Sequence, residues 1–171
     1  ALHSIDIAVS ASLDMRITMD VVLEQVVRNL QMDAGSIMIL NPHSFTLEHI
    51  ASRGMRTSAY KSCIHHLGES ASGRAALEQK PVLIPDISEA PEDLKCPMFD
   101  KEDFVAGFFL PLMAKGQVKG VIAVFNRKAF NPGTEWLDFF EIIAGQASIA
   151  IDNSTLFNDL QRSNSDLFLA Y

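Results

Sequence analysis

FVAGFFLPLMAKGQVKGVIAVFNR, the stretch Phe104–Arg127, decides the fold of this chain. It consists of two long apolar segments on either side of Lys115-Gly116. A two-residue loop that ends in Gly is typical of a β-hairpin, because such a tight turn requires positive φ. The stretch therefore predicts two antiparallel strands. Pro111 has no backbone N–H for the ladder, so we expect a bulge or a local gap there.

The pairing that follows from this turn predicts how the sheet is packed. Ala114 faces Gln117, and counting outward places Gly107 opposite Val124. Small residues then lie opposite large ones along the hairpin. Together with the near-continuous apolar runs, this favours a sheet that is covered on both faces.

Composition limits the class of protein. The chain has 171 residues and a formal net charge of −7, which suits one domain plus additional helix and argues against direct binding to nucleic acid or to an anionic membrane. No apolar run approaches the roughly 20 residues that cross a bilayer, so we expect no membrane insertion in this fragment. Two cysteines, Cys63 and Cys96, do not make a disulfide framework, and the expected location is the cytoplasm.

Periodicity and turn residues outline the remaining elements. Helical spacing from Leu2 is expected to break near Leu13-Asp14-Met15, and a second helix is expected over Met19–Leu30. Further expected elements are strands at Ser36–Leu40, Phe45–Ser52 and Pro81–Pro85, a short helix at Ser70–Gln79 with Ser70 as N-cap, irregular segments at Arg53–Gly68 and Asp86–Glu102, and a long helix from Thr134 to Tyr171.

Several segments in this order resemble the GAF domain family. They are AGSIMILN, LGESASGRAALEQKPVLIPD with Gly68, Gly73 and Asp86, the hairpin segment PLMAKGQVKGVIAVFNR, and the long closing helix. The resemblance covers nearly the whole chain. It implies an α+β fold with a central antiparallel sheet of five or six strands. It also implies a helical layer on one face, and a short helix plus loops over a small-molecule pocket on the other.

The layout of that family implies which residues surround the pocket. Arg74 is the expected charged contact with a ligand. The ligand-binding residues expected from this layout are His66, Leu67, Ser70, Arg74, Ile84, Asp86, Phe99, Phe104 and Phe109.

The cyclic-nucleotide branch of the family carries an Asn-Lys, Phe and Asp-Glu signature after the hairpin. Asn126-Arg127, Phe130 and Glu135 match it loosely, but Thr134 replaces the Asp, so the ion pair of that signature cannot form as such. We favour the alternative that Asn126 ends a strand and Thr134 caps a helix.

Cofactor chemistry has little support in the sequence. Bilin-binding relatives attach the pigment through a Cys that is often followed by His, whereas Cys63 precedes Ile64 and Cys96 precedes Pro97. His65-His66 beside Cys63 could ligate haem or iron, but adjacent residues rarely both reach one metal. We therefore expect solvated histidines in a surface loop, and no metal, haem, bilin or other cofactor.

No catalytic motif is present, so the expected module is non-catalytic. One branch of the family reduces free methionine sulfoxide with cysteines in the pocket, which leaves an enzymatic alternative open. Cys63 and Cys96 both lie in expected loops and could approach each other.

The closing helix carries a heptad-like seam. It begins at Gln146 and includes Asn153, the kind of polar residue that fixes register in parallel dimers. We expect a parallel homodimer through the terminal helices. Its expected interface residues are Ile149, Asn153, Leu156, Leu160 and Leu167.

These patterns divide the chain into a linker helix at 1–16, a GAF domain at 17–152 and a signalling helix at 153–171 that leads to an output domain outside this fragment. The last segment, LFNDLQRSNSDLFLAY, resembles linkers before HD-GYP output domains, a family of cyclic-di-GMP phosphodiesterases. Histidine kinases and diguanylate cyclases use similar linkers. The expected function is a sensory module that binds a small ligand, dimerises, or does both. A pure dimerisation module with an empty pocket is the main alternative.

Overall fold

The computed structural model describes the backbone of residues 2–169 and the side chains of residues 14–154. A six-stranded sheet forms its centre, in the order β3-β2-β1-β6-β5-β4, and every neighbouring pair is antiparallel. This confirms the antiparallel α+β fold. The strands are β1 (Ala34–Asn41), β2 (Thr46–Arg53), β3 (His65–His66), β4 (Val82–Ile84), β5 (Ala106–Ala114) and β6 (Gln117–Asn126).

The β5–β6 hairpin turns at the predicted residues. Lys115 and Gly116 have φ angles of 53° and 74°, so both adopt the left-handed conformation that a tight hairpin turn needs. Ala114 pairs with Gln117, as predicted. Farther out the predicted register is wrong by one residue, because Gly107 pairs with Phe125 and not with Val124.

A bulge causes this difference. The register shifts between Leu112 and Met113, which pair with Gly120 and Val118, so β6 has one residue more than β5 at this point. That extra residue is Lys119, whose Nζ lies 3.3 Å from Oδ1 of Asp152. A bulge changes the direction in which a side chain of the strand points, and here it directs Lys119 toward Asp152. The bulge follows Pro111, which itself pairs in register with Val121.

The described residues form four α-helices around the sheet: α1 (Leu2–Asn29), α2 (Ser70–Glu78), α3 (Pro97–Glu102) and α4 (Thr134–Leu169). The predicted break near Leu13 is wrong, because α1 is continuous through Leu13-Asp14-Met15 and this segment holds no Gly or Pro. The expected loop Asp86–Glu102 is also structured. It contains α3 and two 3-10 helices, Ile87–Glu89 and Glu92–Leu94.

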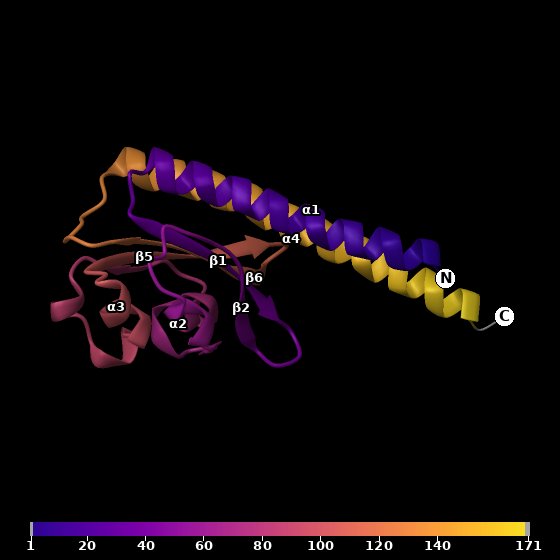
Figure 1. Cartoon of the computed structure of the whole chain (residues 1–171), viewed down its shortest axis with the longest axis horizontal. Helices are drawn as coiled ribbons and strands as arrows, with labels where there is room; N and C mark the ends of the chain where they lie inside the picture. Colours follow the sequence, from indigo (N-terminus) through magenta and orange to yellow (C-terminus); the bar gives the residue numbers. More distant parts are fainter. Residues whose placement is uncertain (1, 170–171) are drawn as a thin grey trace.

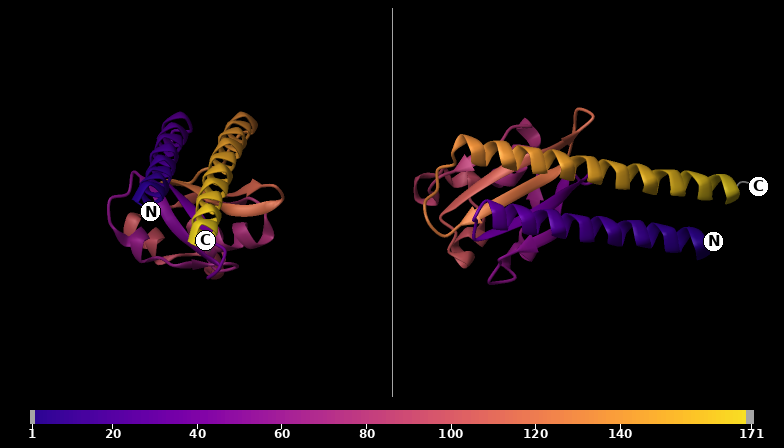
Figure 2. Two further views of the ribbon diagram at one scale, coloured as in Figure 1. Left: turned by 90° about the vertical axis from the view of Figure 1, so that its right-hand side faces the viewer. Right: turned by 90° about the horizontal axis from the view of Figure 1, so that it is seen from above.

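Figure 1 shows the two layers around the sheet: α1 and α4 cover one face, and α2 and α3 cover the other. We call these the helical face and the loop face. Figure 2 shows α1 and α4 side by side. The end of α1 meets the start of α4, where Nε1 of Trp136 donates a hydrogen bond to the carbonyl oxygen of Leu30 at 3.3 Å. The two helices therefore run in opposite directions. None of the described helices combines the length and the apolar character that crossing a membrane requires.

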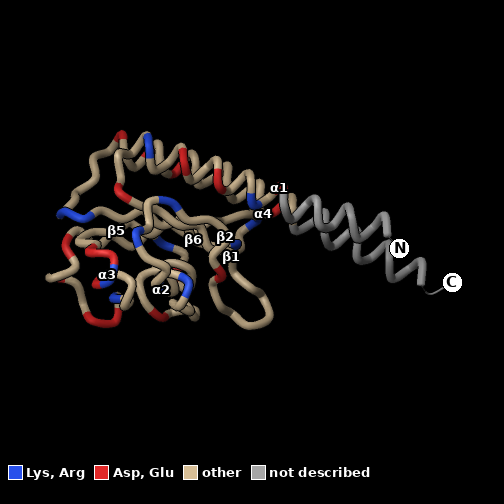
Figure 3. The backbone as a smooth tube through the Cα atoms, in the orientation of Figure 1, with Lys and Arg blue, Asp and Glu red and all other residues tan. Residues whose placement is uncertain are grey.

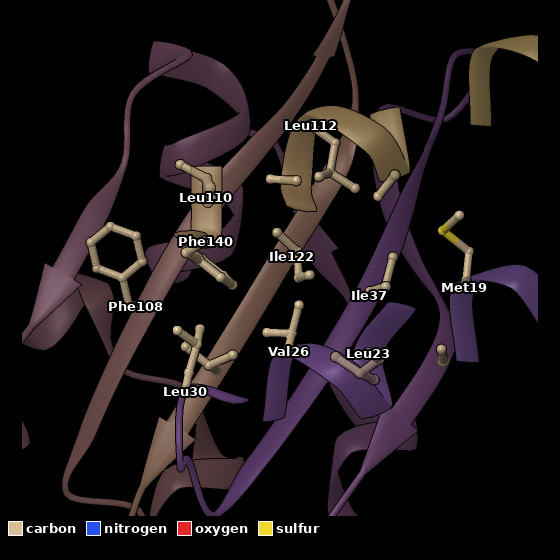
Figure 4. Packing of buried hydrophobic residues seen from close by; sticks show 14 of the residues in the cluster. Met19, Leu23, Val26, Leu30, Ile37, Phe108, Leu110, Leu112, Ile122 and Phe140 are labelled. Carbon is tan, nitrogen blue, oxygen red and sulfur yellow. The ribbon is translucent and has the colours of Figure 1, made fainter. Parts of the chain in front are cut away.

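The core of the helical face is apolar. Met19, Leu23 and Val26 of α1, with Leu30 just after the helix, pack with Phe140 of α4 onto alternate residues of the strands (Figure 4). Burying each large apolar side chain contributes about 1.5–3 kcal/mol. The sheet side of this core is formed by Ile37, Phe108, Leu110, Leu112 and Ile122.

The loop face has its own core, built largely from phenylalanines. Phe104 and Phe125 stack with ring centroids 4.7 Å apart, and Phe99 and Phe109 both contact Phe125 edge-on at 5.7 and 5.6 Å. All four side chains are buried. The middle of the loop face is thus filled with side chains, and open space lies toward its edge.

A candidate thiol–imidazole pocket

A cavity of about 410 Å³ opens on the loop face. Its walls come from the 3-10 helix Ala59–Ser62, strand β3, the start of α2 and the start of α3. Three of its lining residues, Cys63, His65 and Cys96, carry the chemistry of the site. We call this cavity the thiol–imidazole pocket. Acidic and basic residues both gather on the segments around α3 beside it (Figure 3).

The two cysteines of the chain meet in this pocket. Cys63 follows the 3-10 helix Ala59–Ser62, and Cys96 is the N-cap of α3, where Pro97 occupies the first helical position. Their Sγ atoms are 2.7 Å apart, within hydrogen-bond contact, and both residues are half-buried free cysteines. The structure therefore brings together two thiols that are 33 residues apart in the sequence.

The two thiols have opposite acid–base character. The S–H of Cys96 donates to Cys63, which lowers the pKa of Cys63 to about 6; burial opposes this shift, while a backbone contact at Met98 and the charge of Lys101 support it. The same hydrogen bond, together with burial, raises the pKa of Cys96. At neutral pH Cys63 is thus the thiolate and Cys96 the proton donor. Thiolates, and not thiols, are the nucleophiles and the metal ligands.

His65 completes the cluster. Its ring is buried, and Nδ1 lies 2.9 Å from Oγ of Ser70. Burial, followed by the charge of His49, lowers the pKa of His65 to about 4, so the imidazole is neutral near pH 7. One ligand atom each from Cys63, His65 and Cys96 lies within 4.8 Å of the others. The expectation of a solvated surface histidine is therefore wrong for His65 and correct for His66, which is exposed.

Ser70 has a different role from the one predicted. The N-cap of α2 is Glu69, without a side-chain capping bond, and Ser70 begins the helix. The hydroxyl of Ser70 instead contacts the ring of His65. The Ser70 hydroxyl therefore orients the imidazole of His65 and does not cap the helix.

The Gly68 and Gly73 pair of the sequence motif has a steric reason. A Cβ on Gly73 would lie 2.1 Å from the carbonyl oxygen of His66, and Gly68 has a φ of 84°. The N–H of Gly68 donates to the carbonyl oxygen of Gly73 at 2.8 Å. These glycines let α2 approach β3 closely, which places Ser70 against His65.

The other residues expected at a ligand are distributed around this pocket. Of the nine, Ser70 lines the cavity. Ile84, Phe99, Phe104 and Phe109 are buried together in the core of the loop face. His66 is exposed and Leu67 is partly buried beside it.

The two charged residues of that set are engaged elsewhere. Arg74 forms an ion pair with Asp93. Asp86 accepts hydrogen bonds from the backbone N–H and the hydroxyl of Ser88, at 3.0 and 2.7 Å. Both therefore order the segments that border α2 and α3, and neither lines the cavity.

The sequence does not predict the buried carboxylate of Glu102, at the end of α3. The side chain of Glu102 is fully buried and accepts from the N–H groups of Arg56 and Thr57 at 2.9 and 2.8 Å. It also accepts from the Thr57 hydroxyl at 2.7 Å and pairs with Arg127 at 3.0 Å. Burial alone would raise the pKa of Glu102, but these donors outweigh it and the pKa is lowered. A single Glu at the end of a polar segment carries no sequence signal for this role.

Arg127, at the position where the cyclic-nucleotide signature has Lys, is thus committed to Glu102. Its guanidinium also lies over the ring of Phe104, 4.9 Å from the centroid. Its neighbour Asn126 ends β6, as favoured from the sequence, and accepts a hydrogen bond from the N–H of Asp33 at 3.1 Å.

A second hollow of about 480 Å³ lies between α1 and β2 and is lined by Arg16, Asp20, His49 and Tyr60, among others. The described residues that line it include no group of ligating side chains like that of the thiol–imidazole pocket. Both ring nitrogens of His49 are buried and have no hydrogen-bond partner among the described residues. The ring packs edge-on against His65, with centroids 5.9 Å apart.

Comparisons with solved structures support the fold. The GAF domain of an Acinetobacter phosphoenolpyruvate-protein phosphotransferase is 18% identical, with a TM-score of 0.75, over 91% of this chain and 96% of that one. A type II free methionine-R-sulfoxide reductase from Thermoplasma acidophilum is also 18% identical, with a TM-score of 0.70, over 84% and 96%. Part of a methyl-accepting chemotaxis protein is 20% identical, with a TM-score of 0.67, over 84% and 92%.

None of the curated proteins compared with the chain matches it. At these identities the structural matches show the fold alone. A family model described as GAF domain matches residues 12–152, which is most of the chain. That range contains the whole sheet, α2, α3 and the pocket between them. On the fold and on this match, the chain belongs to the GAF domain family.

Proposed function

We propose that this chain is a cytoplasmic, non-catalytic sensory module that binds a small molecule in the thiol–imidazole pocket and relays its state through α4 to an output domain. The observation that carries the proposal is the position of the pocket. It lies on the loop face, while α4 packs on the opposite face of the same sheet. Part of a methyl-accepting chemotaxis protein, a signalling protein, has a similar fold.

Strand β5 provides a physical link between the faces. Phe109 points into the core of the loop face, and its neighbours Phe108 and Leu110 point into the core of the helical face. Interiors are close-packed, so a shift on one side of a strand is transmitted to the other. Residue Phe99 of α3, next to the pocket, packs against Phe109 with ring centroids 6.3 Å apart.

A second link joins the hairpin to α4 directly. Asp152 of α4, whose side chain is 10% exposed, lies 3.2 Å from Nζ of Lys115 and 3.3 Å from Nζ of Lys119. The hydrogen bond from Lys115 contributes most to lowering the pKa of Asp152, so this side chain is a carboxylate at neutral pH. Any displacement of the β5–β6 turn therefore acts on α4 where the helix leaves the sheet. The linker resemblance makes an HD-GYP phosphodiesterase the output domain that we propose.

Ligand binding is tested by a thermal-shift screen of amino acids, purines and cyclic nucleotides against the reduced protein. A ligand at 100 times its Kd stabilises the fold by about 2.7 kcal/mol. Ser62→Trp would fill the pocket from its exposed rim and should abolish the shift. A shift that persists in this variant would place the ligand elsewhere. The absence of any shift would favour the pure dimerisation module with an empty pocket.

We also propose a parallel homodimer through α4. Ile142 and Ile149 are 62% and 61% exposed and lie seven residues apart, so they share one face of the helix. Asn153 is exposed near them. The side chains of Leu156, Leu160 and Leu167 lie outside the described residues.

The dimer is tested with Ile149→Asp, which puts one carboxylate from each copy into the proposed seam. We expect a folded monomer by light scattering and circular dichroism, because desolvating unpaired carboxylates costs several kcal/mol per ion. Ile17→Asp is the matched control, since Ile17 is 62% exposed on α1, outside the seam. If Ile149→Asp remains a dimer, the interface lies elsewhere.

The thiol pair supports a second candidate function, reduction of a sulfoxide such as free methionine sulfoxide. The observation that favours it is the 2.7 Å approach of Cys63 and Cys96, together with the likeness to a structure that is named as such a reductase. Two thiols and one sulfoxide would give a disulfide, a thioether and water. Dithiol-dependent turnover by the purified chain, abolished in Cys63→Ser, would support this function. Lack of turnover would support the non-catalytic module.

A further inference from the structure

We propose that Cys63, His65 and Cys96 bind a single thiophilic divalent metal ion, with Zn²⁺ as the expected ion and an open fourth position facing the cavity. The inference goes beyond the proposed function, because the metal would bind whether or not the chain transmits a signal. Among the described residues these three form the group of His, Cys, Asp or Glu side chains that is close enough to hold one ion, with ligand atoms within 4.8 Å of one another.

The types of ligand select the metal. Two thiolates and one imidazole are ligands for Zn²⁺ and other soft or borderline ions, whereas Mg²⁺ and Ca²⁺ prefer oxygen. A Cys₂His set with one free position is a known zinc arrangement in proteins. On binding, the ion displaces the proton of Cys96, and the two thiolates then neutralise the charge of a divalent ion, so the half-buried site needs no further anion.

The backbone places the three ligands on one side of the pocket. Cys63 is in an extended conformation, with φ −84° and ψ 114°, and His65 follows two residues later in β3. Alternate residues of an extended segment point to the same side, which unites Cys63 with His65 and directs the side chains of Ile64 and His66 away from these two ligands, although Ile64 still borders the cavity. Ile64 and His66 are indeed exposed. The expectation of no metal assumed that two adjacent histidines would have to share an ion, and this geometry removes that assumption.

The third ligand and the ring orientation are also held in place. Cys96 precedes α3, where the N–H of Phe99 donates to the carbonyl oxygen of Cys96 at 2.9 Å. The contact of Ser70 Oγ with Nδ1 of His65, at 2.9 Å, fixes the imidazole. Hydrogen bonds of this kind commonly orient metal-ligating histidines.

Binding requires a small opening of the thiol pair. Tetrahedral geometry with Zn–S near 2.3 Å separates two sulfurs by roughly 3.8 Å. The Sγ atoms now lie 2.7 Å apart, so they would move apart by roughly 1 Å. Both cysteines flank short helical segments and line the 410 Å³ cavity, which leaves open space beside them for such a movement.

The experiment is an anaerobic titration of the reduced, chelator-treated chain with Co²⁺, a spectroscopic substitute for Zn²⁺. We expect one equivalent to bind, with thiolate-to-cobalt charge-transfer absorption and tetrahedral d–d bands that Zn²⁺ abolishes. His65→Gln should weaken binding by more than the roughly 10–100-fold that the loss of an outer-shell partner costs. His66→Gln is the matched control and should bind as the unmodified chain does. Absent bands, or equal binding by His65→Gln, would overturn the proposal.

A second measurement does not depend on variants that fold. X-ray absorption at the zinc edge of the loaded, unmodified chain should show two sulfurs, one imidazole nitrogen and one further light atom. One equivalent of Zn²⁺ should also protect both thiols from alkylation. A shell without sulfur, or thiols that react equally fast with Zn²⁺ present, would contradict the site. The ligand screen above, repeated with a chelator, separates the two proposals, since binding there without metal supports the sensory function alone.

Discussion

The two faces of the sheet are built from different materials. The core of the helical face is a continuous set of aliphatic and aromatic side chains from α1, α4 and alternate strand residues. The loop face adds to its phenylalanines a buried carboxylate, a buried imidazole and a thiol pair. Apolar packing tolerates exchange of similar volumes, whereas buried polar groups depend on each partner. We therefore infer that one face maintains the fold and the other carries the chemistry.

The largest expected effect is on the helical face. Phe140 is fully buried, so Phe140→Ala should lower the free energy of unfolding by about 3–5 kcal/mol. Phe45→Ala is the matched control, because Phe45 is 58% exposed, and it should change stability by less than about 0.5 kcal/mol. Urea denaturation measures both. Equal losses in the two variants would contradict the assignment of Phe140 to the core.

On the loop face, Glu102→Gln should cost about 1.5–3 kcal/mol, since it weakens hydrogen bonds to a charged group. Its pKa in the folded protein is below the ordinary value of 4.5, so its stabilising contribution is complete above that pH. The contribution is lost as pH falls through the lowered value. The unmodified chain should lose stability on acidification more steeply than Glu102→Gln. Asp100→Asn, at an exposed residue of α3, should follow the unmodified chain.

Two glycines sharpen the contrast. Gly73→Ala places a methyl group against the carbonyl oxygen of His66 and should destabilise the fold by about 1–3 kcal/mol. A Cβ added to Gly145 of α4 would point into open space, so Gly145→Ala should stabilise the helix by about 0.5–1 kcal/mol. Thermal unfolding gives both signs. A neutral Gly73→Ala would mean that α2 can move away from β3 at little cost.

The same contrast explains what the sequence could predict. Strand periodicity, the Lys115-Gly116 turn and the helical spacing over Met19–Leu30 depend on local patterns, and most of the sheet and the helical face follow from them. The approach of Cys63 to Cys96, which lie 33 residues apart, depends on where the short helix α3 begins. Pro97 after Cys96 is the local signal for a helix start at this point.

Burial of single polar residues was harder to foresee. His65 lies in a strand of two residues, too short to produce an alternation pattern. Glu102 is buried because distant backbone donors at Arg56 and Thr57 converge on it, and no spacing in the sequence marks that convergence. The aromatic core illustrates the reverse case. Phe99, Phe104 and Phe109 were expected around a ligand, and the structure packs them against one another and Phe125.

The smallest expected effect on stability accompanies a large one on reactivity. In the metal-free, reduced chain, alkylation of Cys63 should reach half its maximal rate near pH 6, because its lowered pKa makes it a thiolate above that pH. Cys96 should react slowly over the same range, since its pKa is raised. Mass spectrometry after iodoacetamide treatment distinguishes the two sites.

Cys96→Ala removes the S–H donor that contributes most to the shift, so the midpoint for Cys63 should move up toward 9.0. Lys101→Met removes only the last of the causes and should move it less. If the midpoint stayed near pH 6 in Cys96→Ala, the acidity of Cys63 would not depend on its partner thiol.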